Sequence, residues 1–353
     1  MIKAVLQHFV LGTDEPLVEA FGTGLINNTW VVKTSHKKYI LQRINQHVFK
    51  VPQAIDDNIT AIDNYLRKNF PGYIFTSPVV SKEGATLINQ EGNYFRLFEF
   101  IEGSHTYTVL QNPQLAYEAS KQFGKFTKLL SGFDATQLKT TIPDFHNLSL
   151  RYGQFQAAIK NASAERLERC REMINALQQQ YDIVETFESI KTNTAFKTRV
   201  MHHDTKISNV LFDENNKGIC VIDLDTVMPG YFISDVGDMM RTYLSPADEE
   251  ETDLSKIDVR EDYFDAIVRG YLSEMHDELS DEEKKYFVYA GKFMIYMQAL
   301  RFLADYLNND IYYGAKYDLH NFNRAANQLT LLNILIKKEP VLNKRTETFL
   351  TKA

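Results

Sequence analysis

VMHHDTKISNVLF, residues 200–212, and VIDLD, residues 221–225, are the part of this sequence that decides its fold. Two apolar runs, 210–212 and 219–222, flank the turn-rich connection 213–218, and this pattern predicts a β-hairpin. Polar residues precede the first strand, and two acids follow the second. Because a hairpin brings these two positions to one end, we expect the polar and acidic side chains to lie close together.

The polar residues have the spacing H-x-D-x-K-x-x-N, whose last three members are Asp204, Lys206 and Asn209. Asp223 follows fourteen residues after Asn209. Kinase-type phosphoryl transfer needs a carboxylate for the acceptor proton, a cation beside the moving phosphoryl group, and oxygen ligands for Mg²⁺. The sequence therefore predicts Asp204 as the catalytic base and Lys206 as the cation. Asn209 and Asp223 are the predicted magnesium ligands.

Two other interpretations of these residues are weaker. A single H-x-D or D-x-D is usually a capped turn, but the whole set on one predicted hairpin favours catalysis. A metal-dependent hydrolase built on residues 202–204 lacks a helical H-E-x-x-H, and no complete ligand set is visible.

The composition is that of an ordinary globular protein, with 353 residues, 44% hydrophobic, 24% charged and a formal net charge of −7. This length suits two domains or one bilobal unit, and the charge gives no pull toward nucleic acid or an anionic membrane. Cys170 and Cys220 predict neither a disulfide framework nor a zinc site. No signal peptide or membrane span is recognised. We therefore expect a cytoplasmic monomer.

Residues 1–103 predict a small α+β lobe with strands at 31–34, 39–44, 73–80, 85–89 and 94–101 and a helix opening at Pro52. The turn at 21–24 carries Gly22 and Gly24, which let the backbone approach phosphates, although an ordinary hairpin turn explains them about as well. Arg43 lies inside the second strand and has three possible environments: a phosphate, a carboxylate of the helix, or solvent at an edge.

Residues 104–353 predict a mostly helical lobe, interrupted by the hairpin. Ser234 is the predicted cap of one helix, and the acidic run 248–251 is predicted to be a solvated loop. The expected fold class is therefore α+β, with a five-stranded N-terminal lobe and a helical C-terminal lobe.

In their order, the Gly-rich turn, the strand cation, FIEG at 100–103, H-x-D-x-K-x-x-N and I-D-x-D resemble the aminoglycoside phosphotransferase and choline kinase superfamily, which has the protein-kinase-like bilobal fold. Residues 21–24, 40–45, 203–206, 221–230 and 300–307 are similar to the subgroup of N-acetylhexosamine 1-kinases. The resemblance spans about residues 20 to 330. His203 and Leu25 depart from it, since close relatives commonly have Asn and His there.

The resemblance implies ATP-dependent, Mg²⁺-dependent phosphorylation of the anomeric hydroxyl of GlcNAc or GalNAc. It assigns the nucleotide to Gly22, Gly24, Asn27, Arg43, Glu99 and Ile101, the last two in the hinge that receives adenine. It assigns the metal to Asn209 and Asp223 with Asp225 nearby, and it implies that Asp235 braces the catalytic loop.

For the acceptor, the resemblance favours Arg301 and Tyr312 beside Asp204 and Asp223. Asp305 lies four residues after Arg301 on a largely apolar helix, so a buried ion pair between them is an open alternative. An aminoglycoside, choline or other amino-alcohol acceptor would call for an acidic or aromatic pocket. A binding module without turnover is the least favoured alternative, because it would need none of the catalytic set.

Overall fold

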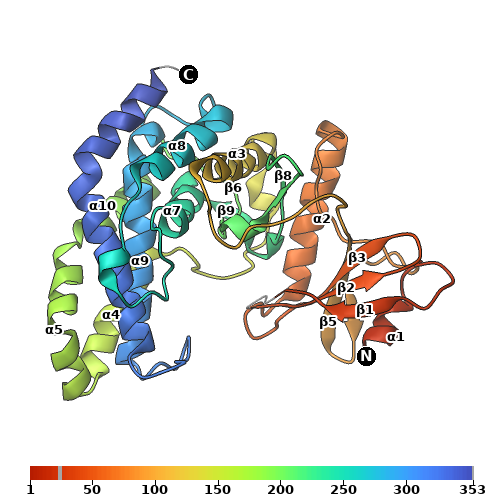
Figure 1. Ribbon diagram of the computed structural model, residues 1–353, viewed down its shortest axis with the longest axis horizontal. Helices are drawn as coiled ribbons and strands as arrows, with labels where there is room; N and C mark the ends of the chain where they lie inside the picture. Colours follow the sequence, from red (N-terminus) through yellow and green to blue (C-terminus); the bar gives the residue numbers. More distant parts are fainter. Residues whose placement is uncertain (23–25, 352–353) are drawn as a thin grey trace.

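The computed structural model describes residues 1–22 and 26–351. It has the predicted protein-kinase-like α+β fold, in which a five-stranded antiparallel sheet precedes a larger, mostly helical lobe (Figure 1). Within the described ranges, no helix is both long enough and apolar enough to cross a membrane.

The N-terminal sheet has the strand order β1-β2-β3-β5-β4, with every neighbouring pair antiparallel. One face packs with the short first helix around buried Val5, Leu41 and Leu97. Because side chains alternate along a strand, Ile40 and Gln42 of β3 lie on the opposite face. The elements of this lobe are α1 (Ile2–Leu6), β1 (Leu17–Ala20), β2 (Asn28–Lys33), β3 (Lys38–Arg43), α2 (Pro52–Asn69), β4 (Ile88–Gln90) and β5 (Asn93–Glu99).

The strand predicted at 73–80 is wrong. This segment makes only one isolated bridge, Pro78 to Phe98, beside β5. Proline has no backbone N–H to donate, so a ladder cannot continue through Pro78. The fifth strand of the sheet is instead β1, whose four residues pair with β2 on the opposite edge.

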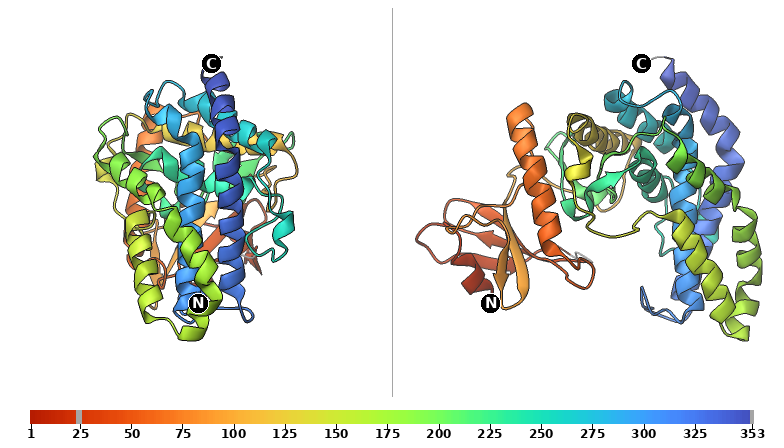
Figure 2. Two further views of the ribbon diagram at one scale, coloured as in Figure 1. Left: turned by 90° about the vertical axis from the view of Figure 1, so that its left-hand side faces the viewer. Right: turned by 180° about the vertical axis from the view of Figure 1, so that it is seen from behind.

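Helix α2 stands between the sheet and the helical lobe (Figures 1 and 2). Pro52 occupies its first turn, as predicted, and Ile55, Ile59 and Ile62 form a buried stripe. This stripe belongs to the core of the helical lobe, not to the core of the sheet. Asn58 strengthens the attachment, because its amide donates to the carbonyl oxygens of Lys139 and Val227 at 2.8 and 3.1 Å.

The helical lobe is assembled around α9, whose 21 residues are all buried except Lys292 and Arg301. Lys292 pairs with Glu339 of α10 at 2.9 Å. The helices are α3 (Pro113–Leu129), α4 (Leu148–Asn161), α5 (Ala164–Gln179), α6 (Asp182–Thr192), α7 (Phe232–Tyr243), α8 (Glu261–Met275), α9 (Phe287–Leu307) and α10 (His320–Leu350). The strands are β6 (Arg199–Met201), β7 (Val210–Phe212), β8 (Gly218–Val221) and β9 (Met228–Gly230).

The predicted hairpin is confirmed, since β7 and β8 pair antiparallel with Val210 opposite Val221. Two other predictions for this lobe are wrong. Helix α7 begins at Phe232, so Ser234 lies inside its first turn and caps nothing. The acidic run is not a free loop, because Glu249 lies between two arginines, Arg241 at 2.7 Å and Arg324. Arg241 lies near the end of α7, eight residues before Glu249, whereas Arg324 comes from α10, so a local pattern cannot show the pair of cations.

Candidate active site

The loop between β6 and β7 is held from beneath by Asp235 of α7. The backbone N–H groups of His202 and His203 donate to the two carboxylate oxygens of Asp235 at 3.0 and 2.8 Å. His203 has φ +66°, a left-handed conformation that costs free energy unless its surroundings fix it. The two hydrogen bonds supply that restraint, so Asp235 braces the loop in the way the resemblance implied.

The next turn of the loop is fixed by the same helix. Thr205 donates its N–H to Asp238 at 2.8 Å and its hydroxyl to the carbonyl oxygen of Asp235 at 2.8 Å. The Tyr243 hydroxyl donates to the Thr205 carbonyl oxygen at 2.6 Å. Asp204, between these anchored residues, therefore has a defined backbone position.

The three predicted residues of the loop come together around Asp204. The Lys206 ammonium lies 3.0 Å from one carboxylate oxygen of Asp204. The Asn209 amide nitrogen donates to the Asp204 carbonyl oxygen at 2.8 Å and to its other carboxylate oxygen at 3.1 Å. Although burial disfavours the Lys206 ammonium, the carboxylates of Asp204 and Asp238 outweigh it and raise the pKa of Lys206.

Asp223 follows β8 in a left-handed conformation, with φ +60°. Desolvation by burial between the lobes, and then the charges of Asp225 and Asp204, raise the pKa of the Asp223 carboxyl to about 7, although the side chain still faces the open cleft. A cation bound here would relieve that repulsion.

The donor set fits Mg²⁺. The amide nitrogen of Asn209 makes both contacts to Asp204. Its side-chain oxygen accepts no hydrogen bond from any described residue, so that oxygen is available to a metal ion. Within the described ranges, no three His, Cys, Asp or Glu side chains converge on one point. Asn209 and Asp223 offer two oxygens, and Mg²⁺ commonly takes one or two protein oxygens and completes its shell with water and phosphate.

A cavity of about 310 Å³ lies between the lobes and includes Asn209 and Asp223 in its wall. Gly22, Glu99 and Ile101, assigned to the nucleotide from the sequence, also line it. Its apolar lining includes Ile40, Phe98, Phe100, Leu211 and Ile222. The apolar part of this cavity is therefore suited to a flat apolar ring, and the part that contains Asp223 is charged.

The other assigned nucleotide residues are placed differently. Gly24 lies outside the described residues. Asn27 donates to a carboxylate oxygen of Asp225 at 2.7 Å, so it ties the sheet lobe to the segment after β8. Arg43 is not among the residues that line the cavity, and its guanidinium donates to Asn28 at 2.7 Å. The structure shows none of the environments considered for Arg43: the residue is half-buried at the end of the central strand, paired with β2 and β5, and its side-chain partner is the neutral amide of Asn28.

Sequence reasoning missed the cation that the cavity does contain, Arg96 of β5. It is 2% exposed, and it lies 2.5 Å from a carboxylate oxygen of Asp225. Asp225, assigned to the metal, thus has one oxygen beside Arg96 and the other bonded to Asn27. The sequence did contain a signal for this ion pair. An arginine between Phe95 and Leu97 in a predicted strand is expected to be buried, and a buried arginine needs an anionic partner.

Arg301, assigned to the acceptor from the sequence, faces a second cavity, of about 350 Å³, between α4 and α9. Its guanidinium lies 5.8 Å from the ring centre of Tyr312 and 5.4 Å from that of Tyr313. Arg151 of α4 lines the same cavity. Across the described part of the chain, neither arginine forms an ion pair; Arg151 donates to Asp144 O and Gln154, and Arg301 to Gln298.

Asp305 does not pair with Arg301. Its carboxylate accepts hydrogen bonds from the backbone N–H groups of Tyr312 and Tyr313 at 2.7 and 2.9 Å, and from the Asn321 amide at 3.1 Å. Asp305 therefore fixes the loop that carries Tyr312, and the alternative of a buried ion pair is wrong.

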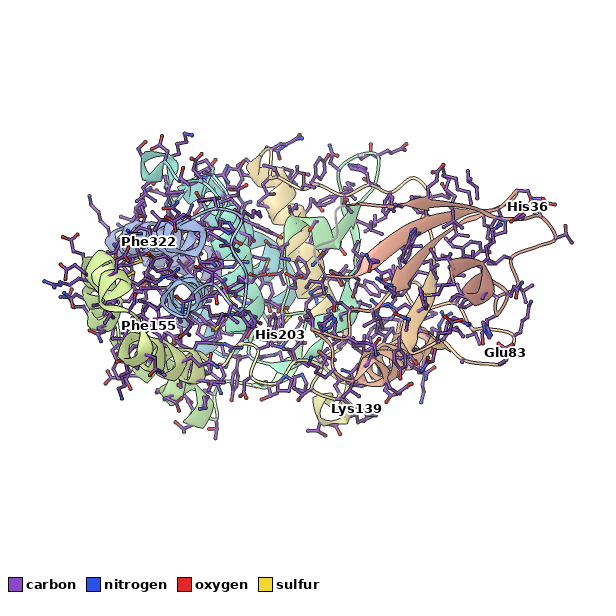
Figure 3. The ribbon with its side chains drawn as sticks, turned by 90° about the horizontal axis from the view of Figure 1, so that it is seen from below. His36, Glu83, Lys139, Phe155, His203 and Phe322 are labelled. Atoms are coloured by element: carbon purple, nitrogen blue, oxygen red, sulfur yellow. The ribbon has the colours of Figure 1, made fainter. Side chains whose placement is uncertain are left out.

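His203 links the loop between β6 and β7 to His146, which lies just before α4. In Figure 3 it lies near the junction of the lobes, far from His36 and Glu83 at the outer end of the sheet. Its Nδ1 lies 3.2 Å from Nδ1 of His146. Burial lowers the pKa of His146, and the charges of His203 and then Arg301 lower it further. Both imidazoles are therefore neutral near pH 7.

Comparison with known proteins identifies the family of this chain and proteins with a similar fold. The family described as "Phosphotransferase enzyme family" matches residues 18–279. An aminoglycoside phosphotransferase from Alicyclobacillus acidocaldarius has 12% identity and a TM-score of 0.64, over 99% of this chain and 96% of that one. A spectinomycin phosphotransferase in complex with ADP and spectinomycin has 14% identity and a TM-score of 0.55, over 96% and 97%. Choline kinase from Cryptosporidium parvum has 16% identity and a TM-score of 0.58, over 98% and 96%.

Proposed function

The chain belongs to the phosphotransferase enzyme family, and on that premise we propose that it transfers the γ-phosphoryl group of ATP to the anomeric hydroxyl of an N-acetylhexosamine. The observation that carries the proposal is the cluster of Asp204, Lys206 and Asn209 beside the cavity between the lobes. The products are ADP and the sugar 1-phosphate.

Asp204 accepts the proton of the sugar hydroxyl as that oxygen attacks the γ-phosphorus. Lys206, already 3.0 Å from Asp204, neutralises charge on the phosphoryl group in the transition state. Asn209 and Asp223 would hold Mg²⁺, which supplies positive charge to the phosphate oxygens when bound. The fixed loop matters because positioning provides much of the catalysis in phosphoryl transfer.

The nucleotide fits the cavity between the lobes. Adenine lies against Ile40 and Leu211 and reaches the backbone between Glu99 and Ile101, while Gly22 lies on the phosphate side. The spectinomycin phosphotransferase was solved with ADP, and its fold matches this chain over nearly the full length of both proteins.

The acceptor site supports a neutral, oxygen-rich molecule. Two arginines that have no carboxylate partner among the described residues, Arg151 and Arg301, would repel an ammonium group but donate hydrogen bonds to hydroxyl or acetamide oxygens. Tyr312, 73% exposed, offers a ring against which a sugar can pack. Choline and aminoglycosides, the acceptors in the names of the similar proteins, carry positive charge and suit this pocket less well.

The test is a screen of GlcNAc, GalNAc, glucose, choline and spectinomycin with Mg²⁺ and ATP, in which phosphorus NMR locates the phosphate in the product. We expect turnover with an N-acetylhexosamine and a phosphate on the anomeric carbon. Asp204→Asn is the matched control and should reduce turnover ~10²–10⁴-fold without loss of folding. Turnover of choline or spectinomycin alone would refute the proposed acceptor, and no ATP consumption with any acceptor would refute the kinase.

A further inference from the structure

The cation of the cavity between the lobes comes from β5 instead of β3. The two strands pair with Gln42 directly opposite Arg96, and both side chains line the cavity. Arg43, one residue further along β3, lies on the other face of the strand, where it bonds to Asn28. The strand position that faces the nucleotide therefore carries a neutral amide, and the neighbouring strand supplies the charge.

Arg96 is held with one nitrogen free. Its Nε and Nη2 both donate to the Gln42 side-chain oxygen, at 3.1 and 2.9 Å. Phe98 lies beneath the guanidinium, 5.1 Å from ring centre to Cζ. The third nitrogen, Nη1, is buried and has no hydrogen-bond partner among the described residues. A buried charged donor without a partner is costly, so an oxygen atom is missing from this arrangement.

The guanidinium already has one anionic partner, Asp225, and Asp225 and Gln42 together fix its plane. Asp225 also accepts a hydrogen bond from the neutral amide of Asn27. Arginine binds phosphate well because its planar fork presents several N–H donors in fixed directions. A guanidinium locked by a neutral amide on one side keeps its remaining donor for such an anion.

We propose that Arg96 is the residue that binds the α- or β-phosphate of the nucleotide, through Nη1, and that Gln42 orients it. This inference rests on the proposed function, because it requires that the cavity takes a nucleotide. It gives Arg43 no contact with the phosphates.

Binding of ADP and of adenosine, each measured by calorimetry, tests the proposal. Arg96→Gln should weaken ADP binding by about 10- to 100-fold, the value of a charge-assisted hydrogen bond, and leave adenosine binding unchanged. Arg43→Gln should change ADP binding less than about threefold, because Arg43 does not line the cavity and bonds only to the neutral amide of Asn28. The double variant Gln42→Lys/Arg96→Gln places the cation on β3 instead of β5. It should bind ADP at least about tenfold more tightly than Arg96→Gln does.

Several outcomes would overturn the proposal. A larger loss of ADP binding in Arg43→Gln than in Arg96→Gln would move the phosphate contact to Arg43. Equal losses of ADP and adenosine in folded Arg96→Gln would make Arg96 a structural residue. If Arg96→Gln does not fold, Arg96→Lys and the double variant decide in its place, and failure of both to bind ADP more tightly than adenosine would refute the role. Absence of ADP binding in the unaltered protein would instead refute the proposed function.

Discussion

Replacing Asp305 and Arg301 one at a time separates a structural residue from a binding residue. Asp305 is 5% exposed and accepts three hydrogen bonds, two of them from the backbone of the loop that carries Tyr312. Hydrogen bonds to a charged group contribute about 1.5–3 kcal/mol each, and water can reach part of this loop after the change. We therefore expect Asp305→Ala to lower the free energy of unfolding by ~3–5 kcal/mol.

Arg301 has no carboxylate partner, so its removal leaves no buried charge behind. We expect Arg301→Ala to change the free energy of unfolding by less than ~1 kcal/mol and to raise KM for the hexosamine about tenfold or more, with KM for ATP unchanged. Asp305→Asn serves as the control, because it keeps the shape and one acceptor oxygen. Its loss of stability should lie between those of the unaltered protein and Asp305→Ala.

Urea unfolding and steady-state kinetics on the three variants provide both readouts. The reasoning fails if Arg301→Ala destabilises the protein as much as Asp305→Ala does. It also fails if Asp305→Ala keeps full stability, since three hydrogen bonds to a buried carboxylate cannot then have mattered.

Three further predictions concern the catalytic loop and its support. Asp223→Ala should abolish Mg²⁺-dependent turnover. Its melting temperature should change little, because the loss of a carboxylate that its neighbours repel offsets the strain of alanine at φ +60°. Recovery of activity on titrating Mg²⁺ would show that Asp223 is only a turn residue. Burial lowers the pKa of His203 from 6.5 to about 4. Between these two pH values the unfolded chain binds a proton on His203 and the folded protein does not. The free energy of unfolding should therefore fall by up to ~3 kcal/mol as the pH is lowered from about 6.5 to about 4. His203→Asn should reduce that loss in urea unfolding at pH 7.5 and 4.5, and an unchanged loss would contradict the assignment. Gly237→Ala would push a methyl group against the carbonyl oxygen of Ala290 and should cost ~1–3 kcal/mol, whereas Gly153→Ala, with open space around it, should be neutral or stabilising in the same assay.

The local patterns of the sequence were enough for the hairpin and for the residues around Asp204. Alternation and turn residues specify β7 and β8, and the loop before β7 brings Asp204, Lys206 and Asn209 together over a span of six residues. Such short separations leave few ways to arrange the side chains. The order of the elements along the chain then predicted the fold class.

Several of the errors concern polar partners that only tertiary packing or loop geometry brings together. Arg96 meets Asp225 only when the lobes come together, and Glu249 meets Arg324 only when α10 packs. Asp305 was compared with its neighbour one helical turn away, but its partners are backbone groups of the following loop. Hydrophobic periodicity does not report such polar contacts, because they are set by tertiary packing.

The attachment of α2 sets where the chain can be divided. A cut at residue 103, the boundary that the sequence predicts between the lobes, would leave the helical lobe without the apolar stripe of Ile55, Ile59 and Ile62. A fragment of residues 104–353 would then expose a hydrophobic groove to water and tend to aggregate. A peptide of residues 51–70, added separately, would restore the missing surface. We therefore expect the smallest independently folding part of this protein to be the helical lobe together with α2, a helix that the sequence places among the strands.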